Sequence, residues 1–170
     1  MIILLMYESA IRVSELINVR LIDFRFSKPY SIKIVGKGNK QRYVPLSEQF
    51  IEKIQEYVLS LNNKKLETDF LFTNHSNHHL TRAGVSHILN KYVTIARKNN
   101  PSLFKENVTP HSLRHTKAMH LLQDDVNLIY IRDILGHSSI QTTEIYARAD
   151  SARLRQAIEK SYKELSTETK

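Results

Sequence analysis

The sequence predicts an α+β fold that is mostly α-helical and contains a small three-stranded antiparallel sheet. Apolar residues recur at helical spacing along most of the chain, and only three short segments are typical of strands. Two of them, residues 31–35 and 41–45, are separated by Gly36-Lys-Gly-Asn-Lys40, which is a turn signal. We therefore expect a hairpin there, and residues 69–73 are expected to supply the third strand.

Two helices are expected before the hairpin, over residues 1–8 and about 13–21. After the hairpin, Ser47 and Thr81 are each placed to cap an amphipathic helix whose apolar residues follow at helical spacing. A polar connection, residues 62–67, ends the first of these two helices.

Thr109-Pro110 is a strong helix start, because a capping residue stands before a proline in the first turn. That helix is expected to run to about Gln123. The next helix, Leu128–Leu135, is expected to stop at Gly136, since glycine favours the left-handed conformation found at helix ends. Two further helices are expected towards the end of the chain, starting at about residues 142 and 154.

Composition limits the class of protein. A chain of 170 residues with 41% hydrophobic content is expected to form one globular domain. The net charge of +8 points to a polyanionic partner, although an ordinary basic surface explains the charge alone equally well. The absence of Cys excludes disulfides, thiolate zinc sites and a Cys nucleophile, and it fits a reducing cytoplasm.

The N-terminal run Met1–Tyr7 is apolar but far too short to span a bilayer, and it has no basic leader or cleavage site. We expect a core helix that begins abruptly. The histidine-rich loop Asn74–His79 invites a metal interpretation. No Cys cluster or paired carboxylates accompany it in the sequence, so a polar loop is expected and no metal site is predicted.

A spaced set of residues in the second half of the chain indicates chemistry. It consists of His111-Ser-Leu-Arg114-His115, then Leu135-Gly136-His137, then Tyr146, with Arg12 and Lys37 upstream. Arg, Lys and His side chains can hold a phosphate and neutralise charge that develops on it. A tyrosine can act as the nucleophile. Together these residues predict phosphoryl transfer by an enzyme that needs no cofactor.

His111 and Arg114 are three residues apart and therefore share one face of their helix. They lie near its N-terminus, where unpaired N–H groups favour anions. For His111 the alternative is a helix-terminal histidine with a structural hydrogen bond. His115 is expected to pack against its neighbours or orient them.

The predicted hairpin is basic. From Lys28 to Arg42 there are five basic residues and no acidic one, so the hairpin is expected to contact DNA. Lys33, Lys40 and Arg42 are the candidate DNA-binding residues. Lys37, in the turn, can be interpreted in the same way, as a solvated loop lysine that touches backbone phosphate.

Five blocks in the same order resemble the catalytic domain of the tyrosine recombinases. This lambda-integrase family includes phage integrases, Xer proteins and integrases of mobile elements. The similarity runs from about Met1 to about Lys160, and it implies the fold of that catalytic domain. It also implies that the chain is a DNA recombinase or integrase without an N-terminal core-binding domain or a first catalytic-domain helix, and therefore a fragment or the product of a truncated gene.

The resemblance implies roles for residues at the matching positions. His111 and Arg114 become the first catalytic histidine and the second catalytic arginine. Lys37 becomes the general acid that protonates the leaving 5′ oxygen, and His137 a hydrogen-bond donor to the phosphate. Tyr146 becomes the nucleophile that forms a 3′-phosphotyrosyl bond, with no need for ATP or metal.

The block around Arg12 departs from the family pattern at one position. The usual Thr-Gly-Leu-Arg-x-Ser-Glu-Leu is here Ser9-Ala10-Ile11-Arg12-Val13-Ser14-Glu15-Leu16. Ala10 replaces the glycine, which is tolerable if the φ angle there is negative. Arg12 itself and Glu15, the acidic residue that supports the site without reacting, both match.

The resemblance also implies a setting for the enzyme. The partner is double-stranded DNA in the cytoplasm of a bacterial, archaeal or phage-infected cell, in association with the nucleoid. Residues 151–170 are expected to form a C-terminal helix and tail that dock on a neighbouring protomer, giving a homotetramer on DNA in the full-length protein and a monomer for this chain alone. Two alternatives stay open: a catalytically idle DNA-binding fragment, and an enzyme like the type IB topoisomerases.

Overall fold

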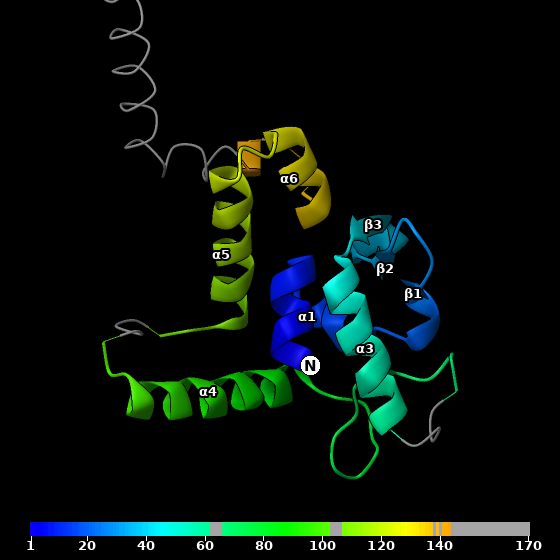
Figure 1. The fold of residues 1–170 in the computed structure, drawn as a ribbon, viewed down its shortest axis with the longest axis vertical. Coiled ribbons are helices and arrows are strands. Elements are labelled where there is room, and N and C mark those ends of the chain that lie inside the picture. The colour runs from blue at the N-terminus through cyan, green and yellow to red at the C-terminus, as the bar shows by residue number, and fades with distance from the viewer. Residues whose placement is uncertain (62–65, 103–106, 138, 140, 144–170) are drawn as a thin grey trace, which may run out of the picture.

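The computed structural model describes residues 1–61, 66–102, 107–137, 139 and 141–143 of the chain (Figure 1). In this part of the chain, α-helices pack against one face of a small antiparallel sheet, and the mostly helical composition with a three-stranded sheet is as the sequence predicts. The elements follow in the order α1 (Ile2–Ser9), α2 (Val13–Leu16), η1 (Leu21–Asp23), β1 (Phe24–Arg25), β2 (Ser31–Val35), η2 (Lys37–Asn39), β3 (Gln41–Pro45), α3 (Glu48–Ser60), α4 (Arg82–Asn99), α5 (Pro110–Gln123) and α6 (Leu128–Leu135).

The predicted hairpin is confirmed. Strands β2 and β3 pair antiparallel, with Ile32 opposite Val44 and Ile34 opposite Arg42, and η2 forms the turn. The sheet order is β1-β2-β3. Since side chains alternate between the faces of a sheet, Arg42 and Val44 lie on the same face.

The predicted third strand is wrong in its location. The third strand is Phe24–Arg25, which pairs with Ser31 and Ile32 of β2. Residues 69–73 form only isolated bridges, from Phe70 to Arg20 and from Thr73 to His79. Leu71 and Phe72 are buried in the core instead, and burial favours the same residue types as a strand does.

The second predicted helix is shorter than expected. Helix α2 ends at Leu16 rather than near residue 21. The carbonyl of Val19 accepts a hydrogen bond from the Leu71 N–H at 2.8 Å. This pairing holds the chain in an extended form where the apolar pattern predicted further helix, so a tertiary contact overrides the local preference.

The predicted helix starts are confirmed by their caps. The side chain of Ser47 accepts a hydrogen bond from the Phe50 N–H, and Thr81 and Thr109 do the same at α4 and α5. Helix α6 ends at Gly136, which is left-handed with a φ of 60°. The expected helix that would carry Tyr146, the helix over 154–165 and the tail 151–170 lie outside the described residues.

Two apolar clusters position the site. The larger one joins α1, the inner face of the sheet, α3 and the start of α4. The smaller one consists of Ala10, Ala118, Ile131 and Leu135, and it joins α5 and α6 to the end of α1. The segment after α1 therefore lies between the two clusters, and α5 and α6 pack beside each other at one end of the domain (Figure 1). Among the described helices, none is both long and apolar enough to cross a membrane.

Candidate active site

Two distant arginines meet at the C-terminal end of α6. Arg12 Nη2 donates a hydrogen bond to the Gly136 carbonyl at 3.2 Å, and Arg114 Nη2 donates to the Leu135 carbonyl at 2.5 Å. The last carbonyls of a helix have no partner within it and carry partial negative charge, so they attract guanidinium groups. This end of α6 thus brings together two positive charges from opposite ends of the chain.

Arg114 is buried, with 4% of its surface exposed. Its Nη1 donates to the Ala10 carbonyl at 2.6 Å. Ala10 has a φ of 48°, so the negative angle at which alanine is tolerated without strain is not found. A left-handed alanine costs about 1–2 kcal/mol. Its buried methyl group and the bond from Arg114 offset that cost.

Arg12 stands just before α2, where its main chain is extended. The Arg12 N–H donates to Glu15 Oε2 at 2.9 Å, and Nη1 donates to Oε1 at 3.1 Å. Arg42, from β3, donates to both oxygens of the same carboxylate. Burial alone would raise the pKa of Glu15, but hydrogen bonds and charge from Arg42 and Arg12 outweigh it and lower this pKa. Glu15 is therefore ionised and holds two arginines side by side.

His137 directly follows the carbonyls that bind these arginines. Its Nδ1 lies 3.0 Å from Oγ1 of Thr143, which is fully buried. Burial, and then the positive charges of Arg114, Arg12 and Arg42, lower the pKa of His137 to about 4. The imidazole is consequently neutral near pH 7, and its Nε2 is suited to a neutral hydrogen bond with an anion.

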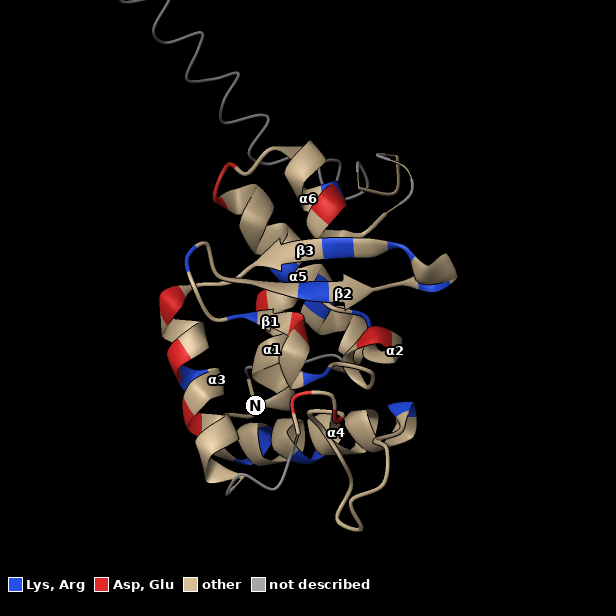
Figure 2. Cartoon of the chain, turned by 90° about the vertical axis from the view of Figure 1, so that its right-hand side faces the viewer, with Lys and Arg blue, Asp and Glu red and all other residues tan. Residues whose placement is uncertain are grey.

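The other predicted catalytic residues lie at different places relative to the cluster of Arg12, Arg114 and His137. His111 is exposed in the first turn of α5, and its charge contributes to the lowered pKa of His137. Lys37 is exposed at the hairpin tip, which extends on the side away from α3 (Figure 2). His115 is exposed on α5. Tyr146 lies outside the described residues.

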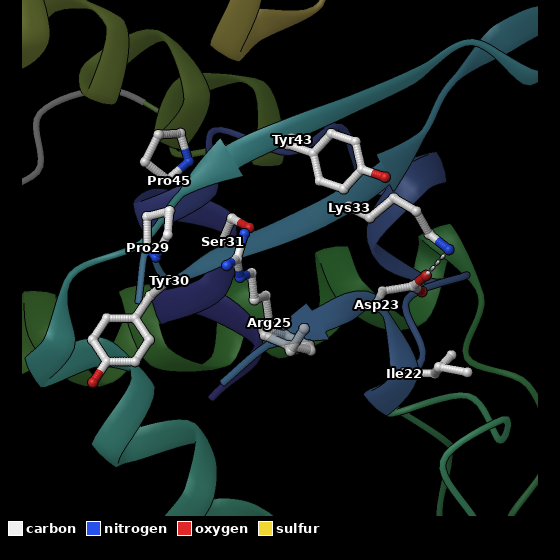
Figure 3. Close-up of a pocket in the computed structure, with 10 residues that line it drawn as sticks. Ile22, Asp23, Arg25, Pro29, Tyr30, Ser31, Lys33, Tyr43 and Pro45 are labelled. Atoms are coloured by element: carbon white, nitrogen blue, oxygen red, sulfur yellow. Dashed lines mark ion pairs between the residues drawn. The ribbon is translucent and has the colours of Figure 1, made fainter. Parts of the chain in front are cut away.

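The candidate DNA-binding residues of the hairpin occupy three different environments. Lys40 is exposed. Lys33 forms an ion pair with Asp23 at 3.2 Å on the outer face of the sheet, in a hollow of about 570 Å³ that also includes Tyr43 (Figure 3). Arg42 faces the opposite way, and its guanidinium is used within the protein. Its three guanidinium nitrogens donate to the Ile134 carbonyl and to the Glu15 carboxylate.

Sequence reasoning missed two members of the site, Arg42 as a partner of Glu15 and Thr143 as a partner of His137. The inward position of Arg42 could have been found, because side chains alternate along β3 and Arg42 therefore lies on the same face as the buried Val44. Nothing local to Thr143 indicates its contact. Within the residues that the structure describes, no group of three His, Cys, Asp or Glu side chains could hold a metal ion.

The fold and the site define a helical domain with a cluster of arginines at the end of α6 and a basic hairpin. The model of the phage integrase family matches residues 1–153, and the chain belongs to that family. It is 35% identical over 155 residues to the tyrosine recombinase XerD of Staphylococcus haemolyticus, covering 89% of this chain and 50% of that protein. It is also 35% identical over 161 residues to the tyrosine recombinase XerA of Pyrococcus horikoshii, covering 95% of this chain and 54% of that protein. The chain thus spans about half the length of these curated relatives.

Solved structures agree with this assignment. A crystal structure of XerA recombinase superposes with a TM-score of 0.76 at 26% identity, over 92% of this chain and 55% of that one. A post-cleavage complex of the XerH site-specific recombinase with palindromic difH substrate gives a TM-score of 0.76 at 30% identity, over 92% of this chain and 43% of that one. The predicted family and fold are therefore confirmed.

Proposed function

We propose that this chain is the catalytic domain of a site-specific DNA recombinase that cleaves and rejoins strands through a 3′-phosphotyrosyl intermediate. One observation carries the proposal. Arg12 and Arg114, which are 102 positions apart, bind the consecutive carbonyls of Gly136 and Leu135, directly before the neutral His137. Two guanidiniums and an imidazole at one point form a site for a single phosphate.

The chemistry that fits this site is a transesterification. The Tyr146 oxygen attacks phosphorus, the bond from phosphorus to the 5′ oxygen breaks, and a phosphotyrosyl bond forms. Arg12 and Arg114 neutralise charge on the non-bridging oxygens as it develops. A 5′-hydroxyl of the partner strand then attacks the phosphotyrosine and releases Tyr146. One phosphodiester replaces another, so the exchange consumes no ATP.

His137 and Lys37 have two further roles, a hydrogen bond to the phosphate and protonation of the leaving oxygen. A neutral His137 donates a hydrogen bond from Nε2 to a non-bridging oxygen, while Thr143 fixes the ring through Nδ1. Lys37, at the tip of the hairpin, gives its proton to the departing 5′ oxygen. His111, in the first turn of α5, adds a further hydrogen bond to the phosphate.

The partner is double-stranded DNA. The XerH structure contains its difH substrate, and the Tn1549 transposon integrase, similar in fold at 21% identity, was solved with transposon right end DNA. We further propose that the full-length protein acts as a homotetramer on DNA in the bacterial or archaeal cytoplasm, with the tail 151–170 docked on a neighbour. Two rounds of exchange would then recombine two duplexes through a Holliday junction.

The decisive test uses a nicked suicide duplex that carries the recombination junction of the host element. Wild-type protein is expected to form an SDS-resistant adduct with the DNA, and Tyr146→Phe is expected to form none. An adduct that persists in Tyr146→Phe would identify another nucleophile. DNA binding without any adduct would favour the idle DNA-binding fragment. In a parallel assay on a supercoiled plasmid, relaxation without strand exchange between duplexes would favour an enzyme like the type IB topoisomerases.

A further inference from the structure

Arg42 joins two parts of the site through one guanidinium group. Its Nη1 and Nη2 donate to Oε1 and Oε2 of Glu15 at 2.9 and 2.8 Å, and its Nε donates to the Ile134 carbonyl at 2.9 Å. The side chain is only 13% exposed. All three nitrogens therefore donate within the protein.

The Arg42 side chain also lies against two glycines, each of which directly precedes a candidate catalytic residue. A Cβ at Gly136 would lie 2.9 Å from Arg42 Nη1 and 3.0 Å from Cδ, and a Cβ at Gly36 would lie 3.8 Å from Nη1. The next residues are His137 and Lys37. A side chain at Gly136 would therefore collide with Arg42, and one at Gly36 would lie at ordinary van der Waals distance from it.

Only arginine fits this set of partners. The fork of Nη1 and Nη2 matches the two oxygens of Glu15, while Nε points a third hydrogen bond at Ile134. A lysine at position 42 supplies one compact ammonium group, which cannot satisfy a bidentate carboxylate and a carbonyl on another element in the same geometry.

We propose that Arg42 is a positioning residue for DNA cleavage. It binds the carboxylate that also binds Arg12, and it fixes the main chain before Lys37 and His137, so three catalytic groups share one arrangement. The inference rests on the proposed function and extends it to a residue that touches no reacting atom. It also replaces the expectation that Arg42 contacts DNA phosphate.

The test measures single-turnover cleavage of the nicked suicide duplex at saturating DNA. Arg42→Gln is expected to lower the rate constant about 100-fold, the scale on which a misplacement of about 1 Å acts. The DNA affinity and its salt dependence are expected to stay as in wild type. Arg42→Lys keeps the charge and is expected to lose about tenfold or more, which gives a second variant if Arg42→Gln does not fold.

Arg25→Gln is the matched control, since Arg25 is an exposed arginine of the same sheet whose hydrogen bonds to the described residues stay within its own loop, at Ser27 and Lys28. Its rate constant is expected to equal that of wild type. If the Arg42 variants lose only the amplitude of cleavage, Arg42 is merely structural. If Arg42→Gln loses about one unit of salt slope at an unchanged rate constant, Arg42 contacts phosphate. Either result overturns the proposal.

An NMR comparison separates this proposal from the proposed function. If wild type forms no adduct, the function fails, but the amide signals of Lys37 and His137 still report their main-chain positions. Both signals are expected to shift in Arg42→Lys and to stay in place in Arg25→Gln. Unshifted signals in Arg42→Lys would overturn the positioning role whatever the activity.

Discussion

At the scale of single residues, the charge state of His137 links stability to catalysis. The imidazole is half-buried beside Arg12, Arg42 and Arg114, with His111 close enough to add to their effect. A phosphate bound at the arginines would bring negative charge and offset these effects. Without DNA, the neutral form of His137 is favoured because it adds no fourth cation to the cluster.

This environment predicts a pH-dependent stability. The pKa of His137 is about 4 in the folded chain, against 6.5 for the ordinary side chain. Between these values the unfolded chain binds a proton that the folded chain does not, so the stability that depends on His137 falls as pH falls from 6.5 to 4, and this one contribution levels off below. Allowing for solvent around the ring, we expect His137 to account for about 1–2 kcal/mol of this loss.

Urea unfolding of wild type and His137→Gln at several pH values would measure this contribution. Glutamine does not titrate, so the free energy of unfolding is expected to depend less steeply on pH between 6.5 and 4 in the variant. Parallel curves for the two proteins would show that the pKa of His137 is not lowered by folding.

At the scale of elements, sequence patterns predicted the structure wherever local chemistry decides it. The caps Ser47, Thr81 and Thr109 each satisfy N–H groups in their own helix, so the helix starts were correct. The third strand was misplaced, because residues 69–73 and a true strand share the same apolar composition. Which segment pairs with β2 depends on the packing of the whole domain.

The candidate site also contains some features that local sequence predicts and others that depend on the packing of the whole domain. Arg12, His111, Arg114 and His137 belong to short motifs whose residue types indicate phosphate chemistry. The contact between Arg42 and Glu15 joins residues 27 positions apart, and no local pattern encodes it. The alternation of side chains along β3 predicts which face of the sheet Arg42 lies on, but it does not predict that Glu15 is its partner.

Gly136, at the C-terminal end of α6, and Gly38, in the turn of the hairpin, offer a matched pair of substitutions. Gly136 and Gly38 have positive φ angles of 60° and 70°, but only Gly136 faces a neighbour, since a Cβ there would lie 2.9 Å from Arg42 Nη1. Both alanine variants are expected to lose about 1–2 kcal/mol from backbone strain. Gly136→Ala is expected to lose more stability and to cleave DNA more slowly, because it must displace Arg42.

Denaturant unfolding and the cleavage assay would compare Gly136→Ala with Gly38→Ala. In the free energy of unfolding, the difference between the two variants isolates the contact with Arg42, since the backbone strain is shared. Equal losses of stability together with equal cleavage rates would show that Gly136 matters only for its φ angle.

At the scale of the whole molecule, the net charge of +8 is unevenly placed. The hairpin formed by β2 and β3 has a basic tip, whereas α3 carries several acidic side chains (Figure 2). Glu48, on α3, pairs with Lys28. Since DNA repels acidic side chains, the domain is expected to approach the duplex with the hairpin and not with α3.

Two lysines test this orientation with the same change in net charge. Lys40 is exposed beside the hairpin turn, and Lys53 is exposed on α3. If Lys40 contacts a phosphate, Lys40→Gln is expected to weaken DNA binding and to reduce the slope of log K against log salt by about 1. Lys53→Gln is expected to leave both close to their wild-type values, because α3 faces away from the duplex. Titrations of a fluorescent duplex at several salt concentrations measure both quantities, and equal effects of the two variants would mean that net charge, rather than the hairpin, determines how this domain binds DNA.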